Sequence, residues 1–178
     1  MENHEIHPLI DRILSDYKES IGVDFERYSN HVKRVYLFTQ ALDNDQRNAD
    51  KYAIAAVFHD IGIWTDHTID YLEPSIAVTH QYLDQNQLSD WKKEIGLMID
   101  MHHKINSYEG DFQNTVSTFR KADWIDVSLG MLRFGVGKKR VKEVRKSIPN
   151  AGFHWFLTKG TFTNFLKHPL NPLPMFRK

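Results

Sequence analysis

Phe58-His59-Asp60-Ile61-Gly62 ends an apolar segment that begins near residue 50. Adjacent side chains on a helix point about 100° apart. His59 and Asp60 can therefore reach a common point only beyond the helix end, where Gly62 stops the helix. Imidazole and carboxylate are common ligands of zinc, manganese and iron. The stretch predicts two metal ligands at the end of a buried helix.

Apolar residues recur at helical spacing along most of the chain, and no strand-like alternation of useful length interrupts them. The spacing predicts an all-α fold. Loops are expected at 43–48, 62–73 and 105–113, the second of them covering a pocket. Helices are expected at 8–20, 25–42, 50–61, 74–85, 90–104, 114–133 and 138–147, followed by an aromatic-rich segment at 153–168.

Other metal-ligand types fall on the apolar faces of these helices. His31, His80, His102 and Asp123 are all placed inward by the helical period, and His103 lies at the edge. A single inward histidine is usually a hydrogen-bonded core residue. Several buried, unpaired imidazoles and carboxylates would be costly, whereas one shared dication satisfies them together. The pattern therefore favours a metal site.

Bulk composition restricts the class of protein. The 178 residues fit one domain, and the absence of Cys leaves only nitrogen and oxygen ligands for a metal. Because 23 basic residues balance 23 acidic ones, no net charge steers the chain toward nucleic acid or an anionic membrane. The N-terminus lacks a signal-peptide pattern and no apolar run is long enough to span a bilayer. These features predict a cytoplasmic protein without a membrane partner.

The basic stretch Arg133–Lys146 holds seven cations and a single acid, Glu143. It could be taken as a nucleic-acid contact. We interpret it instead as a solvated amphipathic helix, because Val136, Val141 and Val144 supply an inward side.

The order His31, His59-Asp60, Asp123 resembles the signature of the HD superfamily of metal-dependent phosphohydrolases. The resemblance covers residues 25–130, and its motifs here are Asn30–Val35, Phe58–Gly62 and Lys121–Asp126. It implies a single HD domain over residues 1–178, an HD-domain helical bundle with a C-terminal helical extension at 138–168. By this resemblance, His31, His59, Asp60 and Asp123 would hold a divalent ion.

Two further histidines resemble the extra ligands of two-metal HD proteins. In those proteins the central aspartate bridges two ions, so Asp60 would bridge here and His80 and His102 would bind the second ion. The alternative is that both histidines only hydrogen-bond substrate or ligand groups. His103 is open between a metal ligand, a phosphate contact and an edge residue, and Asp126 between a partner of a ligand histidine and an exposed residue.

The resemblance implies hydrolysis of a phosphoester, of a nucleotide or another small phosphorylated metabolite. One or two ions of Mn, Fe, Zn or Mg would activate water and stabilise charge on the phosphoryl group. Asp60 would orient ions and water, and Arg34 and Lys104 are candidate phosphate contacts. Ile63 stands where many hydrolytic members carry Lys, which removes one expected contact.

Two alternatives stay open. The same ligand set resembles that of HD-type di-iron oxygenases, and a degenerate HD domain could be a non-catalytic nucleotide-binding module. Five aromatic residues are candidates for stacking a base or ring above the site: Trp64, Tyr71, Tyr108, Trp124 and Phe153. The oligomeric state is left open.

Overall fold

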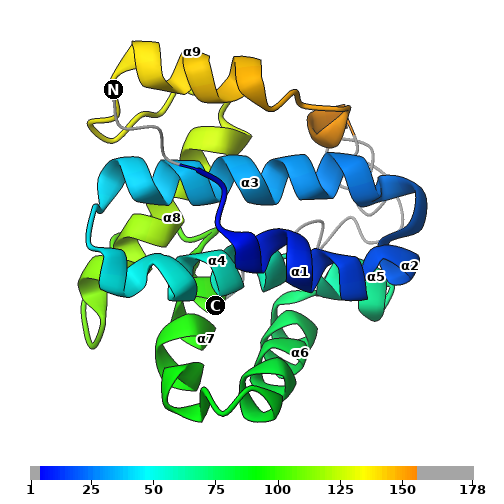
Figure 1. The fold of residues 1–178 in the computed structure, drawn as a ribbon. Helices are drawn as coiled ribbons and strands as arrows, with labels where there is room; N and C mark the ends of the chain where they lie inside the picture. The colour runs from blue at the N-terminus through cyan, green and yellow to red at the C-terminus, as the bar shows by residue number, and fades with distance from the viewer. Residues whose placement is uncertain (1–4, 156–178) are drawn as a thin grey trace, which may run out of the picture.

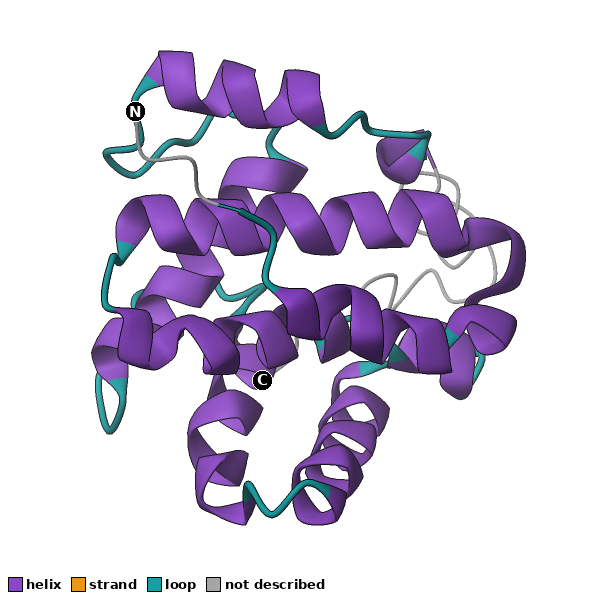
Figure 2. Ribbon diagram, in the orientation of Figure 1, coloured by secondary structure: helices purple, strands orange, loops and turns teal. Residues whose placement is uncertain are grey.

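The structure, a computed structural model, describes residues 5–155. This part of the chain is helical, with no strand among the described residues (Figure 2). Short 3-10 turns occupy Gly22–Asp24, Gln46–Asn48 and Ser89–Trp91. The helices are α1 (Pro8–Asp16), α2 (Lys18–Ile21), α3 (Phe25–Leu42), α4 (Ala49–Phe58), α5 (Gly62–Thr65), α6 (Leu72–Gln85), α7 (Lys92–Met101), α8 (Gln113–Val127) and α9 (Lys138–Ser147).

The apolar helix α4 lies at the centre of the bundle. Every residue from 52 to 58 is buried, as expected of a helix that is hydrophobic on all sides. Helices α1, α3, α6 and α7 pack around it, and the small side chains of Ala53 and Ala56 allow a close approach. Figure 1 shows α3 crossing the molecule on one side of α4, and the α6–α7 pair on the other. His59 and Asp60 therefore emerge from α4 in the interior.

Helix α3 is the longest described helix and packs along α8. Its buried face carries His31, Val35 and Phe38 at the spacing of the helical period. Helix α8 turns Phe119 and Asp123 toward the same interior. This packing brings a histidine near the start of the chain next to an aspartate far along it.

A close crossing fixes the segment after His59-Asp60. A Cβ on Gly62 would lie 2.6 Å from the carbonyl oxygen of Tyr71 and 3.0 Å from the backbone nitrogen of Ser75. The Gly62 amide donates to the Ser75 hydroxyl at 3.0 Å. Only glycine leaves room for this approach. The start of α6 therefore lies directly against the residues that follow the pair.

Several expected boundaries differ from those observed. The first helix breaks at Tyr17 into α1 and α2. The expected loop at 62–73 contains α5 and the first residues of α6, so Pro74 is the third residue of its helix rather than the first. Helix α8 ends at Val127 rather than near 133, because Leu129 and Gly130 take left-handed backbone angles. The amide of Gly130 then donates to the carbonyl of Ile125 at 2.8 Å, which closes the helix.

Two residues of types that often cap helices make other contacts here. Asp24 makes no side-chain cap at α3; it accepts a hydrogen bond from the Trp64 indole at 3.0 Å and pairs with Arg27. Ser89 donates to Asp84 at 2.7 Å. Most of the aromatic-rich segment at 153–168 lies outside the described residues. Within them, no helix is long and apolar enough to cross a membrane.

Candidate metal centre

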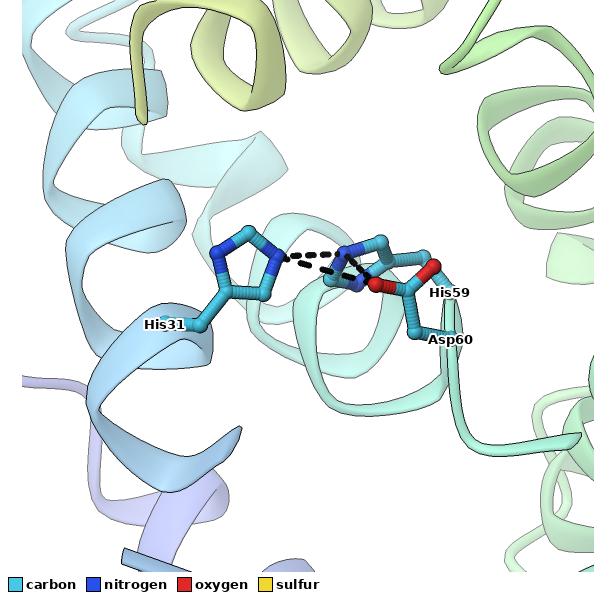
Figure 3. A group of neighbouring side chains, drawn as sticks. All are labelled: His31, His59 and Asp60. Atoms are coloured by element: carbon cyan, nitrogen blue, oxygen red, sulfur yellow. Dashed lines mark hydrogen bonds and ion pairs between the residues drawn. The ribbon is translucent and has the colours of Figure 1, made fainter. Parts of the chain in front are cut away.

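Four side chains from three parts of the chain converge in the interior. His31 comes from α3, His59 and Asp60 follow α4, and Asp123 comes from α8; none is more than 3% exposed. The two Nε2 atoms of His31 and His59 lie 3.0 Å apart. Asp60 Oδ2 lies 3.8 Å from His31 Nε2 and 3.3 Å from His59 Nε2. Asp123 Oδ1 lies 3.5 Å and 3.8 Å from the same two atoms. Figure 3 shows His31 facing His59 and Asp60 across the interior.

The ring orientations are fixed by hydrogen bonds at the other nitrogen. Nδ1 of His31 faces Asp126 Oδ2 at 2.8 Å, and Nδ1 of His59 faces the carbonyl of Ala56 at 2.8 Å. Because both partners are acceptors, each Nδ1 carries the hydrogen and donates it. When the ring is neutral, Nε2 then turns an unshared electron pair toward the centre, which is the form that binds a metal.

The distances fit a single ion. Ligand atoms about 2.1 Å from a metal lie about 3.0–3.4 Å apart when their bonds enclose 90–110°. The two histidine nitrogens lie 3.0 Å apart, and the separations between these nitrogens and the carboxylate oxygens run from 3.3 to 3.8 Å. Among the described residues, Asp123 Oδ2 is buried and has no hydrogen-bond partner. His31, His59 and Asp60 therefore form a group that could hold a metal ion, with Asp123 beside it.

Charge in the metal-free cluster is balanced by a proton. Burial alone would lower the pKa of His59, but the carboxylates of Asp60 and Asp123 outweigh it and raise that pKa to about 9. Burial would raise the pKa of Asp60, yet His59 and His102 hold it well below its ordinary value. Burial raises the pKa of Asp123. A cation is favoured at this point, whether a proton or a metal.

The buried ion pair of Asp126 and Arg34 holds the His31 ring through its Nδ1 atom. Asp126 accepts from Arg34 Nε at 2.7 Å and from Arg34 Nη2 at 2.8 Å, in addition to His31. Burial would raise the pKa of Asp126, but the hydrogen bonds from His31 and Arg34 lower it strongly. Arg34 also donates to the carbonyl of Pro149 at 2.9 Å. Asp126 and Arg34 thus orient a ligand, and Arg34 is occupied by Asp126 rather than directed at the centre.

A second group shares Asp60. His102 Nε2 lies 3.4 Å from Asp60 Oδ1, and within the described chain neither atom has a hydrogen-bond partner. His102 Nδ1 donates to the carbonyl of Ile99 at 2.6 Å, which again leaves Nε2 free to bind. Asp60, His102 and His103 form a second group that could hold a metal ion. The two oxygens of Asp60 therefore face different sets of histidines.

Tyr71, expected as a residue that stacks on a base or ring, instead contacts this second group through its hydroxyl. Its hydroxyl contacts His103 Nε2. Burial, followed by the carboxylates of Asp60 and Asp123, raises the pKa of Tyr71 well above 10, so the phenol is neutral. Burial, followed by His102, lowers the pKa of His103, so this imidazole is neutral as well. Nothing local in the sequence predicts this contact, because the position of Tyr71 depends on how closely α6 crosses Gly62.

His80 was predicted as a metal ligand but lies outside both groups, whereas Lys104 stays a candidate phosphate contact. His80 Nε2 faces the carbonyl of Lys92 at 3.3 Å, at the start of α7. A Cβ on Gly96, near the middle of α7, would lie 3.4 Å from His80 Nε2, so His80 lies about 9 Å along the helix from His102 and does not join either group. Lys104 follows His103, and its buried ammonium nitrogen has no hydrogen-bond partner among the described residues.

The aromatic residues are mostly packed within the fold. Trp64 packs on Tyr28, with ring centroids 4.4 Å apart. Phe153 stacks on the His31 ring, with ring centroids 4.0 Å apart and an angle of 15° between the ring planes. Its ring therefore packs against a candidate metal ligand.

No family model, curated protein or solved structure matches this chain. The functional conclusion rests on the sequence motifs and on the geometry described above.

Proposed function

We propose that this chain is a metal-dependent hydrolase of phosphoesters, of the HD type. The observation that supports this most directly is the convergence of two histidine Nε2 atoms and two carboxylates, all buried and within 3.0–3.8 Å of one another where measured. The fixed Nδ1 atoms make the histidines ready to bind without a change of tautomer.

A divalent ion bound here would lower the pKa of water and offset negative charge on a phosphoryl group. His31, His59, Asp60 and Asp123 would hold it. Asp126 keeps the His31 ring in place. Burial of all these groups excludes bulk water and strengthens each electrostatic contact.

Substrate binding is assigned to Tyr71, which contacts His103, and to Lys104, the next residue after His103 in the chain. Lys104 has an unpartnered, buried ammonium nitrogen and would contact the substrate phosphate. Tyr71 is a neutral donor and would hydrogen-bond the substrate or the leaving group. Arg34 is not retained as a phosphate contact, because Asp126 takes two of its nitrogens.

A two-ion centre is the form we favour. Asp60 Oδ2 belongs to the His31–His59 group, whereas Asp60 Oδ1 faces His102. A carboxylate placed between two ligand sets can bridge two ions. His103 replaces His80 as the second nitrogen ligand in this proposal.

The test uses Asp60→Asn, which keeps the shape of the side chain and removes its charge. We expect this variant to lose bound metal, measured by elemental analysis, and to lose hydrolysis of generic phosphomonoesters and phosphodiesters. His80→Gln is the matched control and should keep both, because His80 contacts the middle of α7 and belongs to neither ligand group. Full turnover by Asp60→Asn would contradict the mechanism.

The shared Asp60 also favours a second candidate, a di-iron oxygenase, because such a centre needs a bridging carboxylate. Two irons per chain and oxygen uptake, without phosphoester turnover, would support the oxygenase.

Metal and nucleotide binding with no turnover of either kind would support the non-catalytic alternative.

A further inference from the structure

The loop between α8 and α9, residues 128–137, exposes apolar side chains at its tip. Leu129 is 50% exposed, Met131 81%, Leu132 45% and Phe134 40%. Isolated exposed apolar residues are ordinary, but four in six positions form a patch. Figure 1 places this loop at the outer edge of the molecule, next to the start of α9.

The loop is held in this shape at both ends. At its start, the amide of Gly130 donates to the carbonyl of Ile125 at 2.8 Å. At its end, Val136 is buried and its amide donates to the carbonyl of Arg133 at 2.8 Å. The apolar side chains therefore point outward from an anchored loop.

Exposed cations lie in this loop and along the helix that follows it. Arg133, Lys138, Lys139, Lys142 and Lys146 are exposed, and none forms an ion pair with any described residue. Two lysines at the start of α7 do have acidic partners: Lys92 pairs with Asp84 and Lys93 with Asp111. We call the loop and the exposed face of α9 together the basic–apolar surface.

The charge of this surface is local. Seven of the 23 basic residues, but only one of the 23 acidic residues, lie in 133–146. The rest of the chain consequently has an excess of acid. A balanced total therefore hides a concentrated positive surface, and the expectation of no membrane partner rested on that total.

We propose that the basic–apolar surface docks on an anionic lipid bilayer. Lysine is depleted in the cores of protein–protein interfaces, so a lysine-rich patch does not suit a protein partner. Duplex nucleic acid would leave the apolar tip without a contact. An anionic bilayer uses both features, because its headgroups attract Lys and Arg while its acyl boundary takes apolar side chains.

The geometry assigns a part to each element. Val141 and Val144 of α9 are buried in the protein, so this helix offers the lipid only its cationic face. The apolar insertion comes from Met131 and Leu132 of the loop. Docking of this kind needs no spanning helix, and it is independent of the proposed hydrolase activity.

The test is co-sedimentation of the full chain with vesicles of phosphatidylcholine alone, or of phosphatidylcholine and phosphatidylserine in equal amounts. We expect binding only to the second. Lys138→Gln with Lys139→Gln should weaken that binding about thirty-fold. Lys92→Gln with Lys93→Gln removes the same charge from the start of α7 and should leave binding nearly unchanged.

A second pair of variants tests the apolar tip. Met131→Ser with Leu132→Ser should weaken vesicle binding about tenfold and leave the charge intact. Val23→Ser, which replaces a residue 95% exposed outside this surface, should have little effect. Equal binding to both vesicles, or equal effects of the test and control variants, would overturn the proposal. Salt-sensitive binding to duplex DNA, or self-association through the loop, without vesicle binding would overturn it as well.

Discussion

The three histidines His31, His59 and His102 are oriented in the same way. In each ring Nδ1 donates to an acceptor of the protein and Nε2 faces the carboxylates of the interior. Two of these Nε2 atoms are 3.0 Å apart, a distance at which their unshared electron pairs repel unless a cation lies near both. Without a metal ion, protonation of His59 supplies the positive charge between the two nitrogens.

Metal binding should therefore release a proton. With a pKa of about 9, His59 is protonated at pH 7, whereas a ligand histidine is neutral. We expect release of about one proton per chain, and an apparent metal affinity that rises about tenfold per pH unit from 7 to 9 before it levels. Isothermal titration in buffers of different ionisation enthalpy measures both quantities. His80→Gln should behave like the natural chain, and a flat affinity over this range would contradict the expectation.

The same shift affects the metal-free fold. Because the pKa of His59 is higher in the folded chain than its ordinary value of 6.5, protonation stabilises the fold fully below that value. This contribution is lost as the pH rises through about 9.

Asp126→Asn should weaken both the fold and the site. It leaves the Arg34 guanidinium buried without its carboxylate, which costs about 3–5 kcal/mol of unfolding free energy. It also weakens the support of His31, so metal affinity should fall about tenfold to a hundredfold. Urea unfolding and metal titration measure the two effects. Asp11→Asn is the control, because Asp11 pairs with Lys33 in an exposed position and should change little. An unchanged metal affinity in Asp126→Asn would show that Asp126 does not help to orient His31 for metal binding.

At the scale of single residues, the sequence indicates which residue types could bind a metal better than it indicates which of them meet in the fold. The helical period places both His80 and His102 on apolar faces, but it does not say how far along a packed helix each one lies. His80 contacts the middle of α7, and His102 follows its end. Tyr71 was predicted near the site as a stacking residue, but its contact with His103 was not, because it depends on the backbone crossing at Gly62.

At the scale of elements, long periodic helices were predictable and short ones were not. The expected helix at 25–42 is confirmed, since its apolar period is continuous over 18 residues. Helix α5 has four residues, too few to show a period. The end of α8 depends on the left-handed angle of Leu129, a residue type that gives no such signal.

Gly62→Ala should disturb the junction between α5 and α6. Its Cβ would approach the Tyr71 carbonyl to 2.6 Å, so the start of α6 must move. We expect a loss of about 1–3 kcal/mol in unfolding free energy, together with weaker metal binding. Gly137→Ala is the matched control: nothing lies within 4 Å of its Cβ, and its φ of −62° suits alanine. Equal stability of the two variants would contradict this expectation, because it would show that the backbone at Tyr71 can shift to make room for the added Cβ.

At the scale of the whole molecule, the absence of strand-like alternation was enough to predict an all-helical architecture. Which helices meet was not predictable from periodicity, because it depends on packing around α4. The pairing of α3 with α8 brings His31 to Asp123 from distant parts of the sequence. An ion held there would join both parts and stabilise the fold as a whole.

The depth of the centre has a kinetic consequence. His31, His59 and His102 have no exposed surface, so an ion among them can leave only when the surrounding helices separate. Removal by an added chelator should then be limited by this opening, with a rate that stops increasing as the chelator concentration is raised. A coloured chelator would report the time course, and a rate that stayed proportional to chelator concentration would indicate an open channel to the ion.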